Sequence, residues 1–318
     1  MRTLFIHTES NEIPKYVESL ASLGHETGVY MFRHALGGGG SPVNIDPEVL
    51  HHVQGFEPEL IVYVGACGRC TKPSPKLFKK LNNEVAPCVL ICSDAADESS
   101  PWWKELFEYD AHDAFRVMVA IDGNSNWPFH DRHLTALTPI SPSWYPNPKR
   151  HSERTIKLGF AGNVGRVYTL KSGRKVGRKM ILDQLPIQLR QRDGTTMDSE
   201  AAAQSYQGCV DFMLNTRIMP NFSDTGSFEH HHVKGRVVEA GLAGCLLLEP
   251  TTSPAKDWFE PGVDYIEYGG IADLKETIRR YIDDPDETEK FGFRLREKVL
   301  AEHTPAKFWG RVFERINR

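Results

Sequence analysis

Residues 230–250 of this 318-residue chain read HHHVKGRVVEAGLAGCLLLEP, and the order of polar, helical and apolar segments in this stretch indicates the fold. A polar loop, NFSDTGSFEHHH at residues 221–232, leads into a helical pattern at Val233–Leu242. Ala243–Gly244 then connects this helix to the apolar run Cys245–Glu249, which predicts a buried strand. A loop, a helix and a buried strand in this order are typical of the βα units that build a parallel sheet.

The amino end of this helix is suited to bind a diphosphate. The first turn of a helix offers unpaired N–H groups and a partial positive charge, to which Lys234 and Arg236 add two full charges. Glu239 follows Arg236 by three residues, so both side chains share one helix face, and the carboxylate could accept hydrogen bonds from ribose hydroxyls. An intrahelical ion pair on a solvated face is the alternative. The small residues between Gly235 and Gly244 favour close approach of a ligand or of a neighbouring backbone.

The alternation of strand and helix patterns extends along the chain. Before residue 138, strands are predicted at residues 3–7, 27–32, 60–65, 88–93 and 116–121, and helices at 14–23, 47–53, 75–81 and 101–107. After residue 150, strands are predicted at 156–161, 210–215 and 245–249, and helices at 176–185, 233–242, 274–282, 287–302 and 305–316. This order predicts an α/β fold with parallel sheets covered on both faces.

A proline-rich segment separates the two series. TPISPSWYPNPKR at residues 138–150 has four prolines and no periodicity, which predicts an extended linker. The length of the chain also favours two domains. We therefore expect two Rossmann-like domains, at residues 1–145 and 146–303, with a cleft between them where ligands bind outside the carboxyl ends of the strands.

Composition and charge exclude several classes of protein. Hydrophobic residues make up 40% of the chain and charged residues 25%, as in ordinary globular domains. The formal net charge of -4 argues against nucleic-acid binding by phosphate neutralisation. No apolar run approaches the roughly 20 residues needed to cross a bilayer, and the amino terminus lacks a signal-peptide pattern, so we expect a cytoplasmic protein with no membrane span.

The cysteines and histidines raise the question of a metal site. The six cysteines lie mostly in or beside apolar runs, and we expect reduced thiols without disulfides. The spacing Cys67-x-x-Cys70 and Cys88-x-x-x-Cys92 suggests zinc as an alternative. Because the second pair lies in a predicted strand, its α-carbons would be about 13 Å apart, too far to share one ion. The histidines at residues 230–232 point in different directions, so we expect them to be exposed or to face a phosphate, and we predict no metal.

The C-terminal half resembles a known family. The segments VKGRVVEAGLAGCLLLEP (233–250), FEPGVDYIEY (259–268) and IADLKETIRRYIDDPDETEKFGFRLREKVLAEHT (271–304), with the aromatic helix after them, resemble the C-terminal domain of spore-maturation (CgeB-like) glycosyltransferases of group 1. The resemblance extends from about residue 158 to the C-terminus. It implies the GT-B architecture, in which two Rossmann-like domains face each other across a cleft and a C-terminal helix, here residues 304–318, packs back on the N-terminal domain.

The resemblance also implies roles for the charged residues of the first helical turn. It assigns Lys234 and Arg236 to the diphosphate of a nucleotide-sugar and Glu239 to the ribose. Many related retaining transferases carry two glutamates separated by seven residues, and the position that far before Glu239 is His231. The recognition of the sugar ring and the retaining mechanism are therefore not implied for this chain.

A second loop within residues 159–180 resembles the first loop of the family's C-terminal domain. There, glycine lets the backbone approach the donor phosphates. We expect Gly162, Asn163, Arg166 and Arg178 to contact the donor. For Arg178 the alternative is a solvated basic face at residues 174–179.

The N-terminal half offers two candidates for a general base. Its first strand runs into HTESNEIP and not into a Gly-x-Gly-x-x-Gly motif, which argues against a dinucleotide oxidoreductase. His7 and Asp94 each close a predicted strand at its carboxyl end, where either could activate an acceptor hydroxyl. A capping or other structural role is the alternative for each. The four glycines at residues 37–40 predict a flexible loop, with an acceptor-binding lid as the alternative.

The implied activity is transfer of a sugar from a UDP-, GDP- or ADP-linked donor to an unidentified acceptor, without a metal or another cofactor. A nucleic acid enters this prediction only as a modified base that accepts the sugar. Two alternatives are a nucleotide-sugar epimerase of the same architecture and a non-catalytic protein that binds sugar nucleotides or serves as a structural protein.

Overall fold

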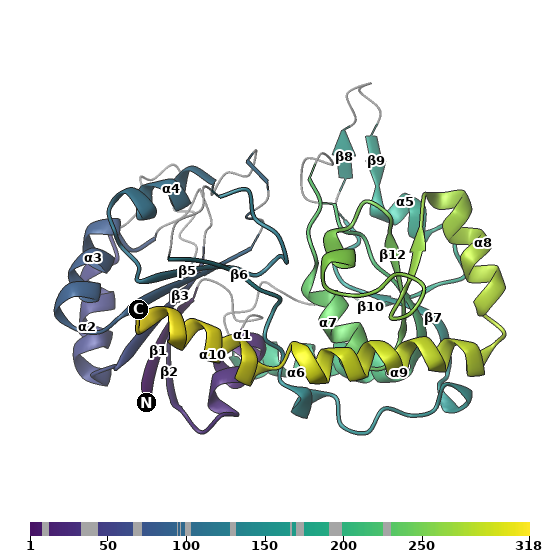
Figure 1. The fold of residues 1–318 in the computed structure, drawn as a ribbon, viewed down its shortest axis with the longest axis horizontal. Coiled ribbons are helices and arrows are strands. Elements are labelled where there is room, and N and C mark those ends of the chain that lie inside the picture. Colours follow the sequence, from purple (N-terminus) through teal and green to yellow (C-terminus); the bar gives the residue numbers. More distant parts are fainter. Residues whose placement is uncertain are drawn as a thin grey trace. The chain divides into compact units, whose positions relative to one another are not determined.

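The computed structural model describes residues 1–7, 13–32, 44–65, 72–93, 95, 97–98, 103–127, 132–165, 167–169, 175–190, 199–224 and 230–318. The chain divides into two compact units (Figure 1). Unit 1 comprises Met1–Pro139, Gly194–Ser199 and Pro305–Arg318, and unit 2 comprises Ile140–Asp193 and Glu200–Thr304. Within the described ranges, no helix is both long and apolar enough to cross a membrane.

Unit 1 is built on a six-stranded sheet with the strand order β2-β1-β3-β4-β5-β6, in which all neighbouring strands are parallel. Its strands are β1 (Arg2–His7), β2 (Glu26–Met31), β3 (Leu60–Val64), β4 (Cys88–Cys92), β5 (Val117–Ala120) and β6 (His133–Thr135). Its helices are α1 (Ile13–Ala21), α2 (Asp46–Phe56), α3 (Pro75–Glu84), α4 (Trp103–Ala111) and α10 (Pro305–Ile316).

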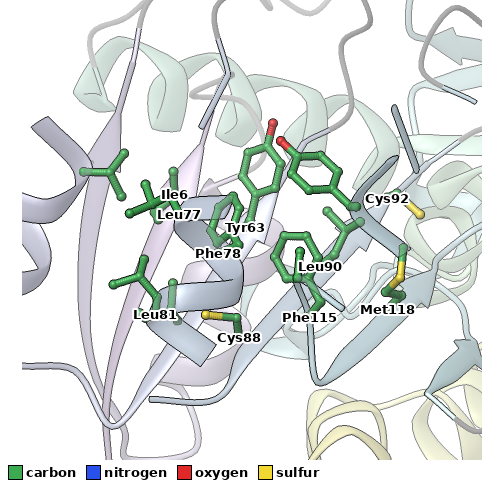
Figure 2. Packing of buried hydrophobic residues seen from close by; sticks show 14 of the residues in the cluster. Ile6, Tyr63, Leu77, Phe78, Leu81, Cys88, Leu90, Cys92, Phe115 and Met118 are labelled. Carbon is green, nitrogen blue, oxygen red and sulfur yellow. The ribbon is translucent and has the colours of Figure 1, made fainter. Parts of the chain in front are cut away.

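Helices cover both faces of this sheet, and for that reason its central strands are continuous apolar runs. Every residue of β3 and β4 is buried, and successive side chains enter opposite cores. Tyr63, Phe78 and Phe115 lie in the core beneath α2, α3 and α4 (Figure 2). The core on the other face joins alternate strand residues to α1 and α10.

The C-terminal helix α10 completes this second core, although it follows unit 2 in the sequence. Trp309 is 0% exposed, its Nε1 donates to Ser19 Oγ at 3.0 Å, and its ring meets Phe5 edge-on with centroids 6.0 Å apart. Arg311 Nη2 donates to the carbonyl oxygen of Thr135 at 2.8 Å. The predicted return of the C-terminal helix to the N-terminal fold is confirmed.

Unit 2 contains a five-stranded parallel sheet with the order β10-β7-β11-β12-β13. A separate antiparallel hairpin is formed by β8 and β9 (Figure 1). The strands are β7 (Ile156–Ala161), β8 (Val167–Thr169), β9 (Lys175–Gly177), β10 (Gln188–Arg190), β11 (Thr216–Pro220), β12 (Leu246–Pro250) and β13 (Ile266–Tyr268). The helices are α5 (Arg178–Leu182), α6 (Ser199–Leu214), α7 (Gly235–Leu242), α8 (Ile271–Tyr281) and α9 (Pro285–Glu302).

One predicted element of unit 2 is wrong, and another is shorter than predicted. Residues 210–214 form the end of helix α6 and not a strand, and Tyr206, Val210 and Met213 are fully buried at helical spacing. The strand that follows is Thr216–Pro220, whose arginine and proline weaken its apolar pattern. The predicted helix at 176–185 begins only at Arg178, because the preceding residues pair in the β8–β9 hairpin.

Candidate functional site

Predicted site residues gather at the carboxyl edge of the unit 2 sheet. Strand β7 ends at Ala161 and continues into Gly162 and Asn163, while β11 ends at Pro220 and continues into Asn221. Helix α7 connects the loop after β11 to β12, so its amino end lies at this same edge. In parallel α/β sheets, this edge is where ligands bind.

Gly162 forms a turn that only glycine adopts easily, and Arg236 lies directly against it. The φ angle of Gly162 is 151°, and its N–H donates to the carbonyl oxygen of Arg190 at 2.9 Å. A Cβ at residue 162 would lie 2.9 Å from Nη2 of Arg236. A side chain here would therefore displace the guanidinium, so the glycine serves the close approach of Arg236.

Two arginines stack on a pair of aromatic rings beside this turn. Phe160 and Phe222 meet edge-on with centroids 5.7 Å apart. The guanidinium carbon of Arg178 lies 5.6 Å from the Phe160 centroid and 5.2 Å from that of Phe222, and that of Arg236 lies 5.7 Å from Phe160. Arg178 Nη1 also donates to the carbonyl oxygen of Asn163 at 2.9 Å. Arg178 therefore lies beside Asn163, Phe160 and Phe222, and its contact with a donor stays a prediction.

Helix α7 begins later than predicted, at Gly235, with Lys234 as its extended N-cap residue. The Nζ atom of Lys234 contacts Nε2 of His232. His232 is 3% exposed, so the exposed alternative for the histidine stretch does not apply to this residue. Arg236 stays in the first turn of the helix, where the N–H groups and the helix dipole favour an anion.

Glu239 is buried and paired with Arg236. The Arg236 Nε and Glu239 Oε2 atoms are 3.3 Å apart, and the side chains are 14% and 2% exposed. The alternative of an ion pair on a solvated face is therefore wrong. A buried carboxylate is stable only with cationic or hydrogen-bonding partners, and Arg236 supplies the cation.

The small residues of α7 have a packing role as well. A Cβ on Gly241 would lie 2.7 Å from Val299 Cγ2 and 3.1 Å from Leu295 Cγ, both on α9. Gly241 therefore lets α7 and α9 approach closely. For the glycines of α7, the sequence left open whether a ligand or another part of the protein approaches closely. At Gly241 it is another part of the protein, the side chains of α9.

Sequence reasoning missed a buried acid at this edge. Glu249 in β12 is 0% exposed, and its carboxyl oxygens accept hydrogen bonds from Asn221 Nδ2 at 2.8 Å and Ser253 Oγ at 2.7 Å. Burial raises the pKa of Glu249 to about 7, although both hydrogen bonds and the charge of His232 oppose the rise. The sequence could have indicated this buried acid, because Glu249 stands at the end of the apolar run that forms β12.

His231, which takes the place of a second glutamate, is held by hydroxyls. Its Nδ1 atom lies 3.1 Å from Ser223 Oγ and 3.4 Å from Thr252 Oγ1. Burial lowers the pKa of His231, and the charge of His232 lowers it further, whereas Asp224 raises it. The imidazole therefore favours the neutral form, and this position carries no negative charge.

The two candidates for a general base have different outcomes. Asp94 lies outside the described residues, as do Arg166 of the donor loop and the four glycines at 37–40. His7 ends β1 as predicted but is 0% exposed, and burial lowers its pKa to about 3. A neutral, enclosed imidazole with so low a pKa is a poor proton acceptor at neutral pH.

The cysteine geometry agrees with the prediction for the second pair. Cys88 and Cys92 are the two ends of β4, and both are free and buried, as are Cys209 and Cys245. Cys67 and Cys70 lie outside the described residues. Within the described part of the chain, no three His, Cys, Asp or Glu side chains are grouped to hold a metal ion.

Comparison with known proteins agrees with this architecture. Residues 194–313 match the glycosyl transferase-like family model. Comparison with curated proteins finds no match.

Several solved structures have the same fold over nearly their whole length. The Anabaena protein Alr3699/HepE in complex with UDP and glucose is 13% identical and aligns over 100% of this chain and 99% of its own, with a TM-score of 0.60. Sucrose-phosphate synthase from Thermosynechococcus elongatus is 9% identical, with 99% of each chain covered and a TM-score of 0.61. An α-glucosyltransferase in complex with UDP-glucose and abasic DNA is 9% identical, covers 100% of this chain and 99% of its own, and has a TM-score of 0.62. The predicted fold class is confirmed.

Proposed function

We propose that this GT-B glycosyltransferase holds a nucleotide-sugar at the carboxyl edge of the unit 2 sheet and transfers the sugar to an acceptor. The transferase class was predicted from the sequence, and the match over residues 194–313 agrees with it, whereas the spore-maturation subtype stays a prediction. One observation carries the assignment of the site: Arg236 lies against the Gly162 turn and is paired with the buried Glu239.

The proposed chemistry is stabilisation of the departing nucleoside diphosphate. Lys234, Arg236 and Arg178 surround the amino end of α7 and the turn after β7 with positive charge. Preorganised cations contribute most where negative charge develops in the transition state. The proposed transfer therefore needs no metal ion or other cofactor. Asn163 and Arg166 complete the proposed phosphate contacts.

The proposed role of Glu239 is to hold the ribose. Since only 2% of its side chain is exposed, Glu239 could also act indirectly by orienting Arg236. The two roles are separable, because a direct contact involves the ribose hydroxyls and an indirect one does not. We expect the direct contact.

The donor and the acceptor are narrower proposals. Two of the solved relatives are complexes with UDP or UDP-glucose, which favours a uridine-linked donor over GDP- or ADP-linked ones. For the acceptor, we propose a site at the carboxyl edge of unit 1 with Asp94 as the general base, since His7 is enclosed and neutral. We place the enzyme in the cytoplasm, where buried free thiols such as Cys88 and Cys245 stay reduced.

Calorimetric titration tests the donor site. UDP, GDP and ADP are titrated into the wild type, R236A and R236K, and E297Q serves as a control because Glu297 is exposed on α9. We expect UDP to bind best, and R236A to lose about tenfold or more in affinity. R236K should also bind UDP weakly. Lysine lacks the planar guanidinium, which can pair with Glu239 and stack on Phe160 at the same time. Unchanged affinity in R236A would refute the site.

A ligand cycle tests the role of Glu239. UDP and a UDP analogue without ribose hydroxyls are titrated into the wild type and E239A, which has no side-chain acceptor at this position. If Glu239 binds the ribose, the analogue binds the wild type more weakly than UDP does, and this difference disappears in E239A. If the same difference persists in E239A, the direct contact does not exist.

Product analysis separates the proposed reaction from its alternatives. Proton NMR of a UDP-sugar incubated with the enzyme shows free sugar and UDP if the enzyme transfers the sugar to water. An epimerase instead gives a new UDP-sugar. Binding without any turnover, also with candidate acceptors present, would favour the non-catalytic alternative.

A further inference from the structure

An open groove of about 740 Å³ lies on unit 1, away from the carboxyl edge of its sheet. Four arginines, two asparagines, one aspartate and one phenylalanine line it: Arg116, Arg132, Arg315, Arg318, Asn82, Asn83, Asp113 and Phe115. We call this feature the arginine groove.

The position of the arginine groove follows from the parallel sheet. Arg116 directly precedes β5 and Arg132 directly precedes β6, so both lie at the amino ends of neighbouring parallel strands. Arg315 comes from the last turn of α10, and Asn82 from the last turn of α3. His7 ends β1 at the opposite edge, which is the edge proposed for the acceptor. The arginine groove is therefore distinct from the proposed acceptor site.

Among the described residues, the guanidinium of Arg116 keeps its positive charge without a carboxylate beside it, although Asp113 also lines the arginine groove. Arg132 is neutralised, since its guanidinium lies 3.1 Å from Asp110 and 2.8 Å from Asp113. Arg116 uses one N–H, which donates from Nε to the carbonyl oxygen of Ile316 at 3.3 Å. Within the described ranges, no carboxylate lies within 4.0 Å of the Arg116 guanidinium.

Helix α10 adds to this positive charge. Arg311 and Arg315 are one turn apart and repel each other. Burial lowers the pKa of Arg311, and the charge of Arg315 lowers it further, while Glu314 opposes the shift. A bound anion in the arginine groove would relieve this repulsion, because it would screen the charge of Arg315.

We propose that the arginine groove binds the phosphate group of a ligand that is neither the sugar donor nor the acceptor. Guanidinium groups bind phosphate through paired N–H groups, and here Arg116, directly before β5, and Arg315, in the last turn of α10, line the same groove. The side-chain amides of Asn82 and Asn83 can donate further hydrogen bonds. The volume falls within the range of small-ligand sites. The same chemistry fits a free phosphorylated metabolite or the headgroup of an anionic lipid.

Titration calorimetry with inorganic pyrophosphate tests this proposal on the full chain. Because the proposed donor site also attracts diphosphates, all proteins carry R236A. We compare this background with added R116Q/R315Q, and with added R279Q/R294Q as a control that removes the same charge from exposed positions on α8 and α9. We expect R116Q/R315Q to weaken pyrophosphate binding about tenfold or more, and the control pair to leave it within about twofold. Melting temperatures verify that each variant is folded.

A second probe distinguishes the two sources of phosphate. Phosphatidylcholine vesicles with and without phosphatidic acid are sedimented with the same proteins. Sedimentation that depends on phosphatidic acid and on Arg116 and Arg315 supports a lipid headgroup, whereas pyrophosphate binding without it supports a soluble ligand. The proposal is overturned if neither probe binds, or if both bind equally well to R116Q/R315Q. Because every protein carries R236A, residual binding at the proposed donor site is the same in all of them, and failure of that site would not change the comparison between R116Q/R315Q and R279Q/R294Q.

Discussion

The replacement of Glu249 by glutamine should remove a pH-dependent loss of stability from unit 2. The Glu249 carboxyl is fully buried, and its pKa is raised from 4.5 to about 7. The folded state therefore holds a proton that the unfolded state releases between these two values. Under this condition the free energy of unfolding falls as pH rises from about 4.5 to 7 and is constant above that range. At about 1.4 kcal/mol per pH unit, the wild type loses about 3 kcal/mol.

Glutamine keeps the shape of this side chain but cannot ionise. Asn221 can still donate to the amide oxygen of residue 249, and the Ser253 hydroxyl can rotate to accept from the amide nitrogen. We therefore expect wild type and E249Q to be similar in stability near pH 4.5. Near pH 8, E249Q should be more stable by about 3 kcal/mol.

Urea unfolding at half-unit pH steps measures this difference. Both proteins are followed in the same buffers, so groups that titrate alike in both cancel. E297Q removes an exposed carboxylate of α9 and should give a curve parallel to the wild type. If E249Q also runs parallel to the wild type between pH 4.5 and 8, ionisation of Glu249 costs nothing and the reasoning is refuted.

Three further predictions concern single positions. G162A should weaken UDP binding about tenfold in calorimetry, since its Cβ would displace Arg236, and should lower the melting temperature, since alanine is strained at this φ angle; equal affinity would contradict this. W309A should lower the unfolding free energy of unit 1 by about 3–5 kcal/mol in urea, because a fully buried indole and its bond to Ser19 are lost, and a loss below 1 kcal/mol would contradict it. The pKa of His7 is lowered to about 3, so the unfolded state binds a proton at this residue before the folded state does. The free energy of unfolding of the wild type should therefore fall as pH drops below 6.5, by about 5 kcal/mol at pH 3. H7L should not show this loss, and equal acid sensitivity in the two proteins would disprove the prediction.

The sequence predicted unit 1 well because burial on both faces leaves a simple signal. The runs LIVYV and CVLIC are apolar at every position. A strand of a sheet that is covered on one face only would instead alternate apolar and polar residues. Strand β6 was missed, since it is three residues long and only one of them, Leu134, is buried. At this length, strand pairing and not sequence pattern decides the structure.

Unit 2 was harder to predict where an amphipathic helix precedes a polar strand. The end of α6 has apolar residues close together at Cys209, Val210 and Met213, which resembles a short strand when the helical period is not followed further back. The true strand, TRIMP, owes its place to pairing with β7 and β12 and not to its own composition.

The residues of the candidate site could be predicted where they lie on one helix. They could not be predicted where their hydrogen-bond partners come from several elements. Lys234, Arg236 and Glu239 follow from the spacing on one helix. The bonds of Glu249 depend on Asn221, at the end of another strand, and on the turn that carries Ser253. An apolar run that ends in glutamate shows that an acid is present but not which donors will surround it.

Arg236 shows how local spacing and tertiary packing act on one side chain. Its ion pair with Glu239 is a property of α7, whereas its contacts with Phe160 and the Gly162 turn depend on β7. A guanidinium held by a carboxylate and an aromatic ring has lost much of its rotamer freedom before a ligand arrives, so binding costs less ordering entropy. The charge that attracts a diphosphate is then already in place when negative charge develops. In the proposed donor site, Glu239 would therefore aid anion binding even though it carries a negative charge, because it fixes the guanidinium of Arg236 that the anion would meet.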